Sequence, residues 1–212
     1  MRILSPISIA CENDYTDAVE LLLKHGADPN TIADDGKCRD RRPHSYDDSI
    51  DMITTLLDIA YRHGNTCIIK LLMDYGIDPN STIYSRYHGN ALSLLTTAIS
   101  DGYADIANLA LKYGATYTRQ TMTPLYSDID YNHTEMIKAI MPYLSDTIIY
   151  QCACFAVENN KPDILDYILA SGRIGTDLKI GGIDAITIAI NNNYTDVVDV
   201  LTNLPTTDIE QC

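Results

Sequence analysis

The chain has 212 residues and a formal net charge of −14, from 15 Lys and Arg against 29 Asp and Glu. An acidic surface repels the phosphate backbone of nucleic acids and anionic lipid headgroups, which disfavours both as partners. No segment approaches about 18 unbroken apolar residues, and the first residues lack the apolar stretch and cleavage site of a signal peptide. Composition therefore predicts a soluble, cytoplasmic protein, with a core of aliphatic side chains because the chain has a single Phe and no Trp.

The first element of the chain is a repeated unit. Residues Ser5–Asn30 align with Thr55–Asn80 without a gap, and the two segments end in similar pentapeptides, GADPN and GIDPN. Self-similarity over this length predicts an array of small structural repeats. We expect an all-α array that forms a single domain over residues 1–212. About six helix-turn-helix repeats are predicted, at residues 5–30, 55–80, 93–118, 123–145, 151–172 and 184–205.

Each predicted repeat has one position, which we call the anchor, near the end of its first helix. A small side chain at the anchor lets neighbouring helices approach closely, and only Asp128 departs from Ala there. Four residues later stands Asp, Asn or Gly, the residue types that adopt a left-handed backbone at low cost, which predicts a tight turn between the two helices. The anchors are Ala10, Ala60, Ala98, Asp128, Ala156 and Ala189. The turn residues are Asp14, Gly64, Gly102, Asn132, Asn160 and Asn193.

After each turn, apolar residues recur at spacings of three and four, which predicts a half-buried second helix. In repeat four, Pro142 lies late in this helix and has no amide hydrogen, so we expect the helix to end early or to kink. Leu144 and Pro205 stand where the helix of repeats four and six should terminate. In the other four repeats a Gly occupies this position and predicts a left-handed helix end: Gly26, Gly76, Gly114 and Gly172.

Two insertions interrupt the array, at residues 31–50 and 81–90. In repeat arrays such insertions form loops on one edge, often the binding edge. Arginine binds carboxylates through two parallel hydrogen bonds, and tyrosine supplies a large contact area, so we predict that the insertions bind a partner. The alternative is that they are solvated loops rich in both charges. The predicted partner-binding residues are Lys37, Arg39, Arg41, Arg42, Tyr46, Tyr84, Arg86, Tyr87 and His88.

Catalytic and metal-binding motifs are weak in this sequence. Cys152 and Cys154 could offer two thiolates, but no second pair of Cys or His lies at a spacing typical of zinc sites. His63 and Cys67 are separated by a predicted turn, and Gly181-Gly182 lacks the lysine of a phosphate-binding loop. The sequence therefore predicts no enzyme, no cofactor and no metal site. The six cysteines show no disulfide framework and are expected to be reduced.

Several of the fifteen tyrosines recur at equivalent positions of different repeats. Packing between neighbouring repeats explains such a pattern, and the alternative is that some of these rings are interface anchors. Tyr15, Tyr103 and Tyr194 directly follow the turn, whereas Tyr75 and Tyr113 precede the terminal Gly.

The segments SPISIA, GADPN, GIDPN and TPLY, with their spaced Leu-Leu pairs, resemble ankyrin repeats over residues 5–204. The resemblance implies pairs of antiparallel helices, joined by outward-pointing hairpins and stacked into a solenoid whose concave face and fingertips bind proteins. The composition rich in Ile, Asn, Tyr and Asp, together with the long fingers, is similar to the ankyrin proteins of poxviruses. Those proteins act in the host cytoplasm as host-range and innate-immunity antagonists. Their F-box-like segment is not recognisable after Leu204, which puts an adaptor role in question.

The resulting hypothesis is a non-enzymatic, monomeric protein-protein interaction module of viral origin. Its partner would be a host cytosolic protein, and binding would modulate innate immunity or host range. The alternative is a cellular ankyrin adaptor, such as a substrate adaptor of a ubiquitin ligase or a regulator like an NF-κB inhibitor. Neither end supplies the polar cap that terminal repeats need, so we also expect a chain truncated relative to a longer member.

Overall fold

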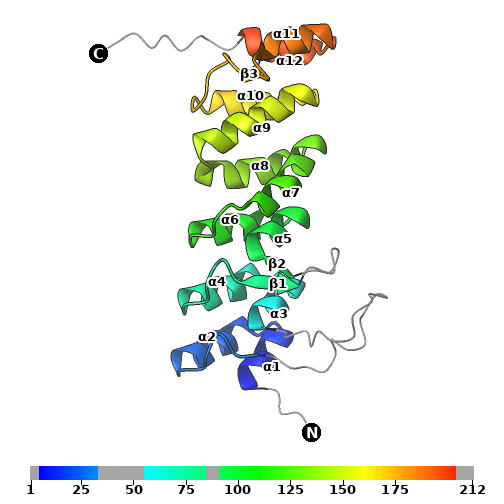
Figure 1. Cartoon of the computed structure of the whole chain (residues 1–212). Helices are drawn as coiled ribbons and strands as arrows, with labels where there is room; N and C mark the ends of the chain where they lie inside the picture. Colours follow the sequence, from blue (N-terminus) through cyan, green and yellow to red (C-terminus); the bar gives the residue numbers. More distant parts are fainter. Residues whose placement is uncertain (1–4, 33–54, 85–90, 204–212) are drawn as a thin grey trace, which may run out of the picture. The chain divides into compact units, whose positions relative to one another are not determined.

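The computed structural model describes residues 5–32, 55–84 and 91–203, and these residues are mainly helical (Figure 1). The helices come in antiparallel pairs, with one tight turn inside each pair. This arrangement confirms the predicted all-α class built from helix-turn-helix repeats. The chain divides into two compact units, residues 1–116 (unit 1) and 117–212 (unit 2), and each is described by itself.

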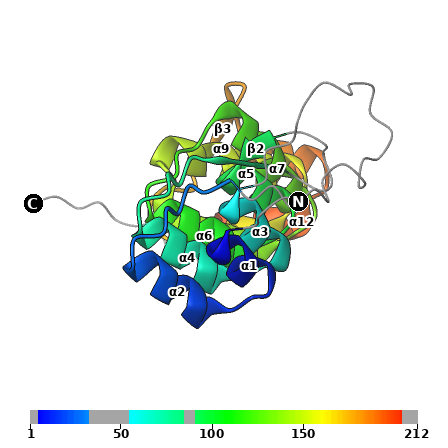
Figure 2. The ribbon, with the colours of Figure 1, turned by 90° about the horizontal axis from the view of Figure 1, so that it is seen from below.

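Unit 1 contains three helix pairs among its described residues, and the first and second helices form separate layers. α1 packs against α3, while α2 packs against α4 and α4 against α6. In Figure 2, α1 and α3 lie on one side of the unit and α2 and α4 on the other. The elements are α1 (Pro6–Glu12), α2 (Thr16–Lys24), α3 (Leu56–His63), α4 (Thr66–Asp74), β1 (Thr82–Tyr84), β2 (Ala91–Ser93), α5 (Leu94–Ser100) and α6 (Ala104–Lys112).

Unit 2 repeats the same arrangement. α9 lies between α7 and α11 in one layer, and α10 lies between α8 and α12 in the other. A short hairpin, β3 with β4, joins the last two pairs. The elements are α7 (Arg119–Asp130), α8 (Thr134–Ile140), the 3-10 turn η2 (Met141–Tyr143), α9 (Asp146–Glu158), α10 (Pro162–Ala170), β3 (Lys179–Ile180), β4 (Ile183–Asp184), α11 (Ala185–Asn191) and α12 (Thr195–Asn203).

The predicted turn geometry is confirmed in every repeat. All six turn residues have positive φ, between 54° and 78°. The next residue donates its backbone N–H to the carbonyl of the anchor at 2.8–3.0 Å in all six repeats. This bond satisfies a carbonyl that the end of the first helix would otherwise leave without a partner. The four predicted terminal glycines, Gly26, Gly76, Gly114 and Gly172, also have positive φ.

Helix boundaries in unit 2 differ from the sequence-based expectation. The first helices of repeats four and five begin at Arg119 and Asp146, about one turn earlier than predicted. Thr118 and Ser145 precede them as N-cap residues, and such caps stabilise a helix start independently of the apolar pattern. The expected early end of the second helix in repeat four is confirmed, because α8 ends at Ile140 and Pro142 lies in the 3-10 turn.

Arg173 ties the end of repeat four, which lacks a terminal Gly, to the following repeat. Its guanidinium donates to the carbonyls of Met141 at 3.1 Å and Leu144 at 2.8 Å. It also pairs with Asp146 at 2.6 Å. The Met141 carbonyl also accepts from the backbone N–H of Leu144 at 3.1 Å, as Leu23 accepts from Gly26 in repeat one, so Arg173 adds contacts from the following repeat at this helix end.

Asp128 is the single charged anchor and is only 5% exposed. Its Oδ1 lies 2.8 Å from His133 Nδ1, while its Oδ2 has no hydrogen-bond partner among the described residues. Burial raises the pKa of Asp128 above its ordinary value, and the contact with His133 offsets part of this effect. Folding therefore favours the protonated carboxyl, and the ionised form is a source of instability in repeat four.

We expect Gly64→Ala to lower the free energy of unfolding by about 1 kcal/mol, because a residue with a Cβ resists the left-handed backbone. No heavy atom lies within 4 Å of a Cβ built at Gly64, so the loss is conformational rather than steric. Urea titration measures the change. The matched control is Gly64→Asn, the residue that three other repeats use at this turn, and it should lose less. Equal losses for Ala and Asn would contradict the explanation.

We expect Asp128→Ala to raise the free energy of unfolding at pH 7 by about 1 kcal/mol, because it removes a buried carboxylate oxygen without a partner. The folded-state pKa is raised, so the destabilisation is fully present above that pKa and disappears as the pH falls through it. The gain should therefore shrink in acid. Urea titrations over a pH series test this prediction. As a control, the reverse change at the next anchor, Ala156→Asp, should destabilise the protein at neutral pH. A loss of stability in Asp128→Ala at pH 7 would contradict this explanation.

Candidate interaction surface

Most of the predicted binding residues lie outside the residues that the structure describes. They are Lys37, Arg39, Arg41, Arg42 and Tyr46 in the first insertion, and Arg86, Tyr87 and His88 in the second. Tyr84 is the last residue of β1, and its backbone pairs with Ala91 of β2. The flanking residues show where each insertion leaves the helical array and where it returns.

The first insertion leaves and returns at one place. Ile32 and Thr55 form an isolated antiparallel bridge, so the two ends of the segment lie next to each other. Thr55 is also the N-cap of α3, with its hydroxyl accepting from the backbone N–H of Asp58 at 3.1 Å. The Asp58 carboxylate in turn accepts from the backbone N–H of Thr55 at 2.8 Å. This reciprocal capping box fixes the return point of the first insertion at the N-terminus of α3.

The second insertion begins and ends in the two-stranded hairpin of β1 and β2. The strands pair antiparallel, with Thr82 opposite Ser93 and Tyr84 opposite Ala91. Ile83 is 1% exposed, and β1 packs against both α3 and α5. Because one side of the hairpin is buried, its register is strongly specified. The residues following Tyr84 and preceding Ala91 therefore start from a fixed base beside α3.

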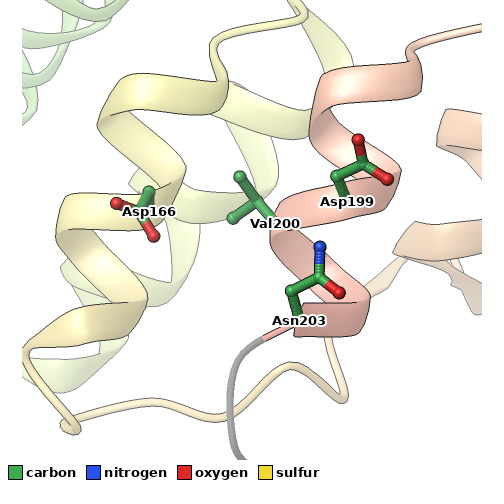
Figure 3. Close-up of a pocket in the computed structure, with 4 residues that line it drawn as sticks. All are labelled: Asp166, Asp199, Val200 and Asn203. Atoms are coloured by element: carbon green, nitrogen blue, oxygen red, sulfur yellow. The ribbon is translucent and has the colours of Figure 1, made fainter.

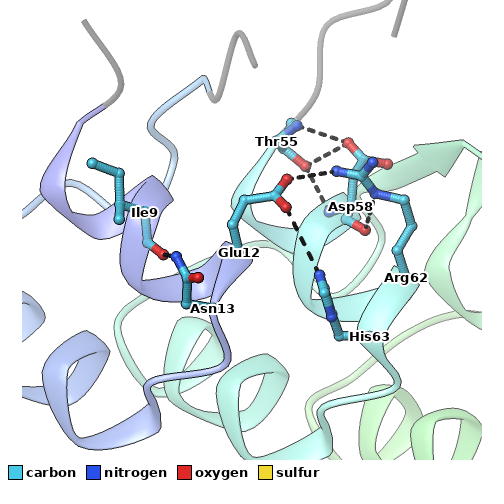
Figure 4. Close-up of polar contacts among 7 residues, drawn as sticks. All are labelled: Ile9, Glu12, Asn13, Thr55, Asp58, Arg62 and His63. Atoms are coloured by element: carbon cyan, nitrogen blue, oxygen red, sulfur yellow. Dashed lines mark hydrogen bonds and ion pairs between the residues drawn. The ribbon is translucent and has the colours of Figure 1, made fainter. Parts of the chain in front are cut away.

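A polar cluster lies along the edge between α1 and α3 (Figure 4). Arg62 Nη2 lies 3.3 Å from Glu12 Oε1, and His63 Nε2 lies 3.9 Å from Glu12 Oε2. The side chains of Glu12 and Arg62 are about one-fifth exposed, so each can contact both its neighbour and a protein partner. The sequence reasoning missed this pair. Its signal is that both residues stand two positions after their anchors, with opposite charges in consecutive repeats.

Tyrosines extend this edge toward α5 and α6. The Tyr61 hydroxyl donates to Asp101 at 2.7 Å, and its ring meets Tyr103 edge-on at 5.5 Å between centroids. Tyr61, which is not one of the recurring tyrosines, is buried, whereas Tyr103 is 42% exposed and Tyr15 is 59% exposed. Exposed tyrosine rings supply contact area and a hydroxyl at low entropic cost. Of the five recurring tyrosines, none is buried: Tyr15, Tyr75 and Tyr103 are exposed, and Tyr113 and Tyr194 are half-buried.

The loops at residues 28–30 and 78–80, which we call the fingertips of repeats one and two, are each ordered locally by an Asp-Pro-Asn sequence. The Asp28 carboxylate accepts from the backbone N–H of Asn30 at 2.9 Å, and Asp78 accepts from Asn80 at 2.8 Å. Asn80 Oδ1 also accepts from the backbone N–H of Thr116 at 2.9 Å, which ties two successive fingertips together. These are turns closed by Asp side chains, and they explain why the motif recurs.

Small-molecule and metal sites find little support in the described parts of the chain. A depression of about 210 Å³ lies between α10 and α12, lined by Asp166, Asp199, Val200 and Asn203 (Figure 3). It is open and smaller than typical ligand pockets. Among the described residues, no three His, Cys, Asp or Glu side chains gather as metal ligands. Burial raises the pKa of the Cys152 thiol to about 12, which makes it a poor nucleophile and ligand.

Within residues 5–32, 55–84 and 91–203, no helix combines the length and apolar character that a bilayer span requires. Two exposed lysines of unit 1 pair with carboxylates on their own helices, Lys24 with Glu20 at 2.6 Å and Lys70 with Asp74 at 2.5 Å. In α4, the hydrogen bond from Lys70 is the main reason that the pKa of Asp74 falls below its ordinary value, and the Tyr113 hydroxyl donates to the same carboxylate.

Comparison with known proteins places these features in a family. The profile described as ankyrin repeats (3 copies) matches residues 4–83 and 56–151. A curated relative is an ankyrin repeat protein, R841, of Acanthamoeba polyphaga mimivirus, which is 34% identical over 111 residues. That match covers 52% of this chain but only 16% of the much longer relative.

Solved structures show the same fold at low sequence identity. One is the ankyrin repeat domain of Bcl-3, a member of the IkappaB protein family. The alignment covers 94% of this chain and 85% of the Bcl-3 chain, with 18% sequence identity and a TM-score of 0.59. An ankyrin repeat domain from Acinetobacter baumannii covers 92% and 95% of the two chains at 16% identity and a TM-score of 0.56. The human ASB11 domain covers 94% and 83% at 18% identity and a TM-score of 0.52. Ankyrin repeats are a scaffold for protein-protein interaction, and this chain belongs to the ankyrin-repeat family.

Proposed function

We propose that this protein is a non-enzymatic, virus-encoded ankyrin module that binds a host cytosolic protein and thereby modulates innate immunity or host range. Binding would use the two insertions and the edge of α3 between them. The observation that supports this proposal is that both insertions leave the array beside α3. One is bounded by the bridge of Ile32 with Thr55, and the other by the β1–β2 hairpin, of which β1 packs on α3 and β2 on α5.

The fixed bases favour binding because they lower the entropy that a partner must remove from the loops. The residues that flank the two segments are paired through their backbones, Ile32 with Thr55 and Tyr84 with Ala91. The Lys37 to Arg42 cluster is basic on a chain of net charge −14, so it supplies a local attraction for an acidic surface. Glu12 and Arg62 add a partly exposed pair of opposite charges at the edge of α3.

The viral origin is supported by the mimivirus relative, whose match covers about half of this chain. The specific likeness to poxvirus proteins rests on composition and on the long fingers. The structural similarity to Bcl-3, at 18% identity, concerns the fold alone and does not favour an NF-κB-inhibitor role. A cellular adaptor remains the competing function, and it predicts a partner from the ubiquitin-ligase or transcription machinery of the same organism.

The test is affinity purification of the tagged full chain from host cytosol, with captured proteins quantified by mass spectrometry. Replacing Arg39, Arg41 and Arg42 with Ala should reduce the main captured protein at least about tenfold, because hot-spot Arg residues dominate interface energy. The matched control replaces Lys24, Lys70 and Lys138 with Ala. These three lysines form exposed ion pairs within single helices, and such pairs contribute little to stability. The control removes the same positive charge and should leave capture within about twofold.

A second variant addresses the other insertion, with Tyr84, Arg86, Tyr87 and His88 replaced by Ser. Each insertion variant should keep the circular dichroism and urea midpoint of the parent, because the substitutions avoid the helical core. Equal loss in the Lys control would assign the effect to net charge and overturn the insertion site. Unchanged capture by both insertion variants would remove the insertions from the binding account. Robust capture of the protein's own ubiquitin-ligase or transcription machinery would instead favour the cellular adaptor.

A further inference from the structure

Two exposed aromatic side chains stack on each other at the turn between α7 and α8. Tyr131 is 72% exposed, and its ring lies 5.9 Å from that of His133 between centroids. The imidazole is held from the protein side, because its Nδ1 lies 2.8 Å from Oδ1 of Asp128, which is only 5% exposed. A carboxyl oxygen at this distance favours the hydrogen on Nδ1, which leaves Nε2 of the neutral ring as an acceptor. The turn therefore presents an ordered aromatic surface with an acceptor nitrogen.

The carboxylates beside this turn stand at positions that form an ion pair elsewhere in the chain. Two residues after the anchor, repeats one and two have Glu12 and Arg62, whose side chains meet at 3.3 Å (Figure 4). Repeats four and five have Asp130 and Glu158 at the same position. α7 packs on α9 as α1 packs on α3. Where unit 1 places an arginine beside a carboxylate, unit 2 therefore places a second carboxylate.

Both carboxylates also stand where a negative charge is unfavourable. Asp130 is the last residue of α7 and Glu158 is the last residue of α9. The C-terminus of a helix has a partial negative charge, which favours cations there. Lys161 donates its ammonium to the Asp130 carbonyl, and its Nζ lies 3.5 Å from Asp130 Oδ1. Glu158 is exposed and forms no ion pair with another described residue, so this surface retains an unbalanced negative charge that a second cation would offset.

The chemistry around this negative charge favours a guanidinium over an ammonium. A guanidinium is planar, stacks on aromatic faces and can donate to two carboxylates at once. Unit 1 shows one guanidinium doing this from within the chain. Arg62 Nη2 contacts Glu12, while its Nε donates to the carbonyl of Asp58 at 3.4 Å. In unit 2 the exposed ring of Tyr131 adds a stacking face beside the two carboxylates.

We infer that four residues, which we call the turn site, bind an arginine side chain of another protein: Asp130, Tyr131, His133 and Glu158. The guanidinium stacks on the Tyr131 ring, pairs with Asp130 and Glu158, and has His133 Nε2 as a further acceptor. The turn site uses residues of unit 2 alone and selects a basic segment, whereas the first insertion selects an acidic surface. It therefore does not rest on the function proposed above.

The experiment uses the peptide acetyl-Gly-Arg-Gly-amide as its probe, titrated into the isotope-labelled full chain and followed by NMR. The backbone amides of residues 130–133 and 158 should shift saturably, with a millimolar dissociation constant because a single side chain supplies the contact. The same peptide with Lys should bind at least about threefold more weakly. The peptide with citrulline, the neutral isostere of Arg, should cause no saturable shift. No saturable shift with the Arg peptide, or equal binding of the citrulline peptide, would overturn the inference.

Glu158→Arg should fill the turn site from within, because it recreates the pair of opposite charges that Glu12 and Arg62 form in unit 1. It should weaken binding of the Arg peptide at least about tenfold, because it replaces an attractive charge with a repulsive one. It should also raise the urea midpoint, since a cation at the end of α9 is favourable. Unchanged affinity or a lowered midpoint would overturn the equivalence of the two positions and with it the turn site.

Two further comparisons separate stacking from net charge. Tyr131→Ala should weaken binding about threefold, whereas Tyr131→Phe should retain it, because stacking needs the ring and not the hydroxyl. The matched control is Asp166→Arg, which makes the same charge change at an exposed position of α10 and should keep the affinity within about twofold. An equal loss in Asp166→Arg and Glu158→Arg would assign binding to net charge and overturn the turn site. Full affinity in Tyr131→Ala would overturn the stacked guanidinium.

Discussion

The left-handed turn inside each repeat is the constraint on which the rest of the structure depends. Its residue has positive φ in all six repeats, and the following backbone N–H donates to the anchor carbonyl at 2.8–3.0 Å. This bond ends the first helix at a fixed distance past the anchor and sends the second helix back beside it. A small anchor then lets α1, α3 and their counterparts pack closely. Stacking in both units follows from this local geometry repeated along the chain.

Local chemistry of this kind could be predicted from the sequence, and contacts between distant residues could not. Gly, Asn and Asp at the turns, Gly at helix ends and Pro142 in repeat four each specify backbone geometry by their own covalent structure. The early starts of α7 and α9 depend on Thr118 and Ser145, cap residues that also occur in ordinary loops. Arg173 satisfies carbonyls 29 and 32 residues away, and nothing in the local pattern marks it for that role.

The sequence predicts which segments form the candidate surface, but not where these segments lie in the fold. Insertions stand out because they break the repeat period, but only the pairing of Ile32 with Thr55 and the burial of Ile83 reveal that both start beside α3. Comparing equivalent positions of different repeats allows contacts between neighbouring repeats to be predicted from the sequence. Glu12 and Arg62 share a position and have opposite charges, and the structure brings them to 3.3 Å.

Repeat four shows how a stacked array tolerates unfavourable residues. It combines a buried carboxyl at Asp128, a Pro in the turn after α8 and no terminal Gly. In an isolated helix pair these features would compound, because nothing else would hold the pair together. In an array, stability is shared between neighbours, so Arg173 of the next repeat can cap α8 and its 3-10 turn. Repeat four therefore departs most from the repeat pattern at its helix end, where the following repeat supplies contacts.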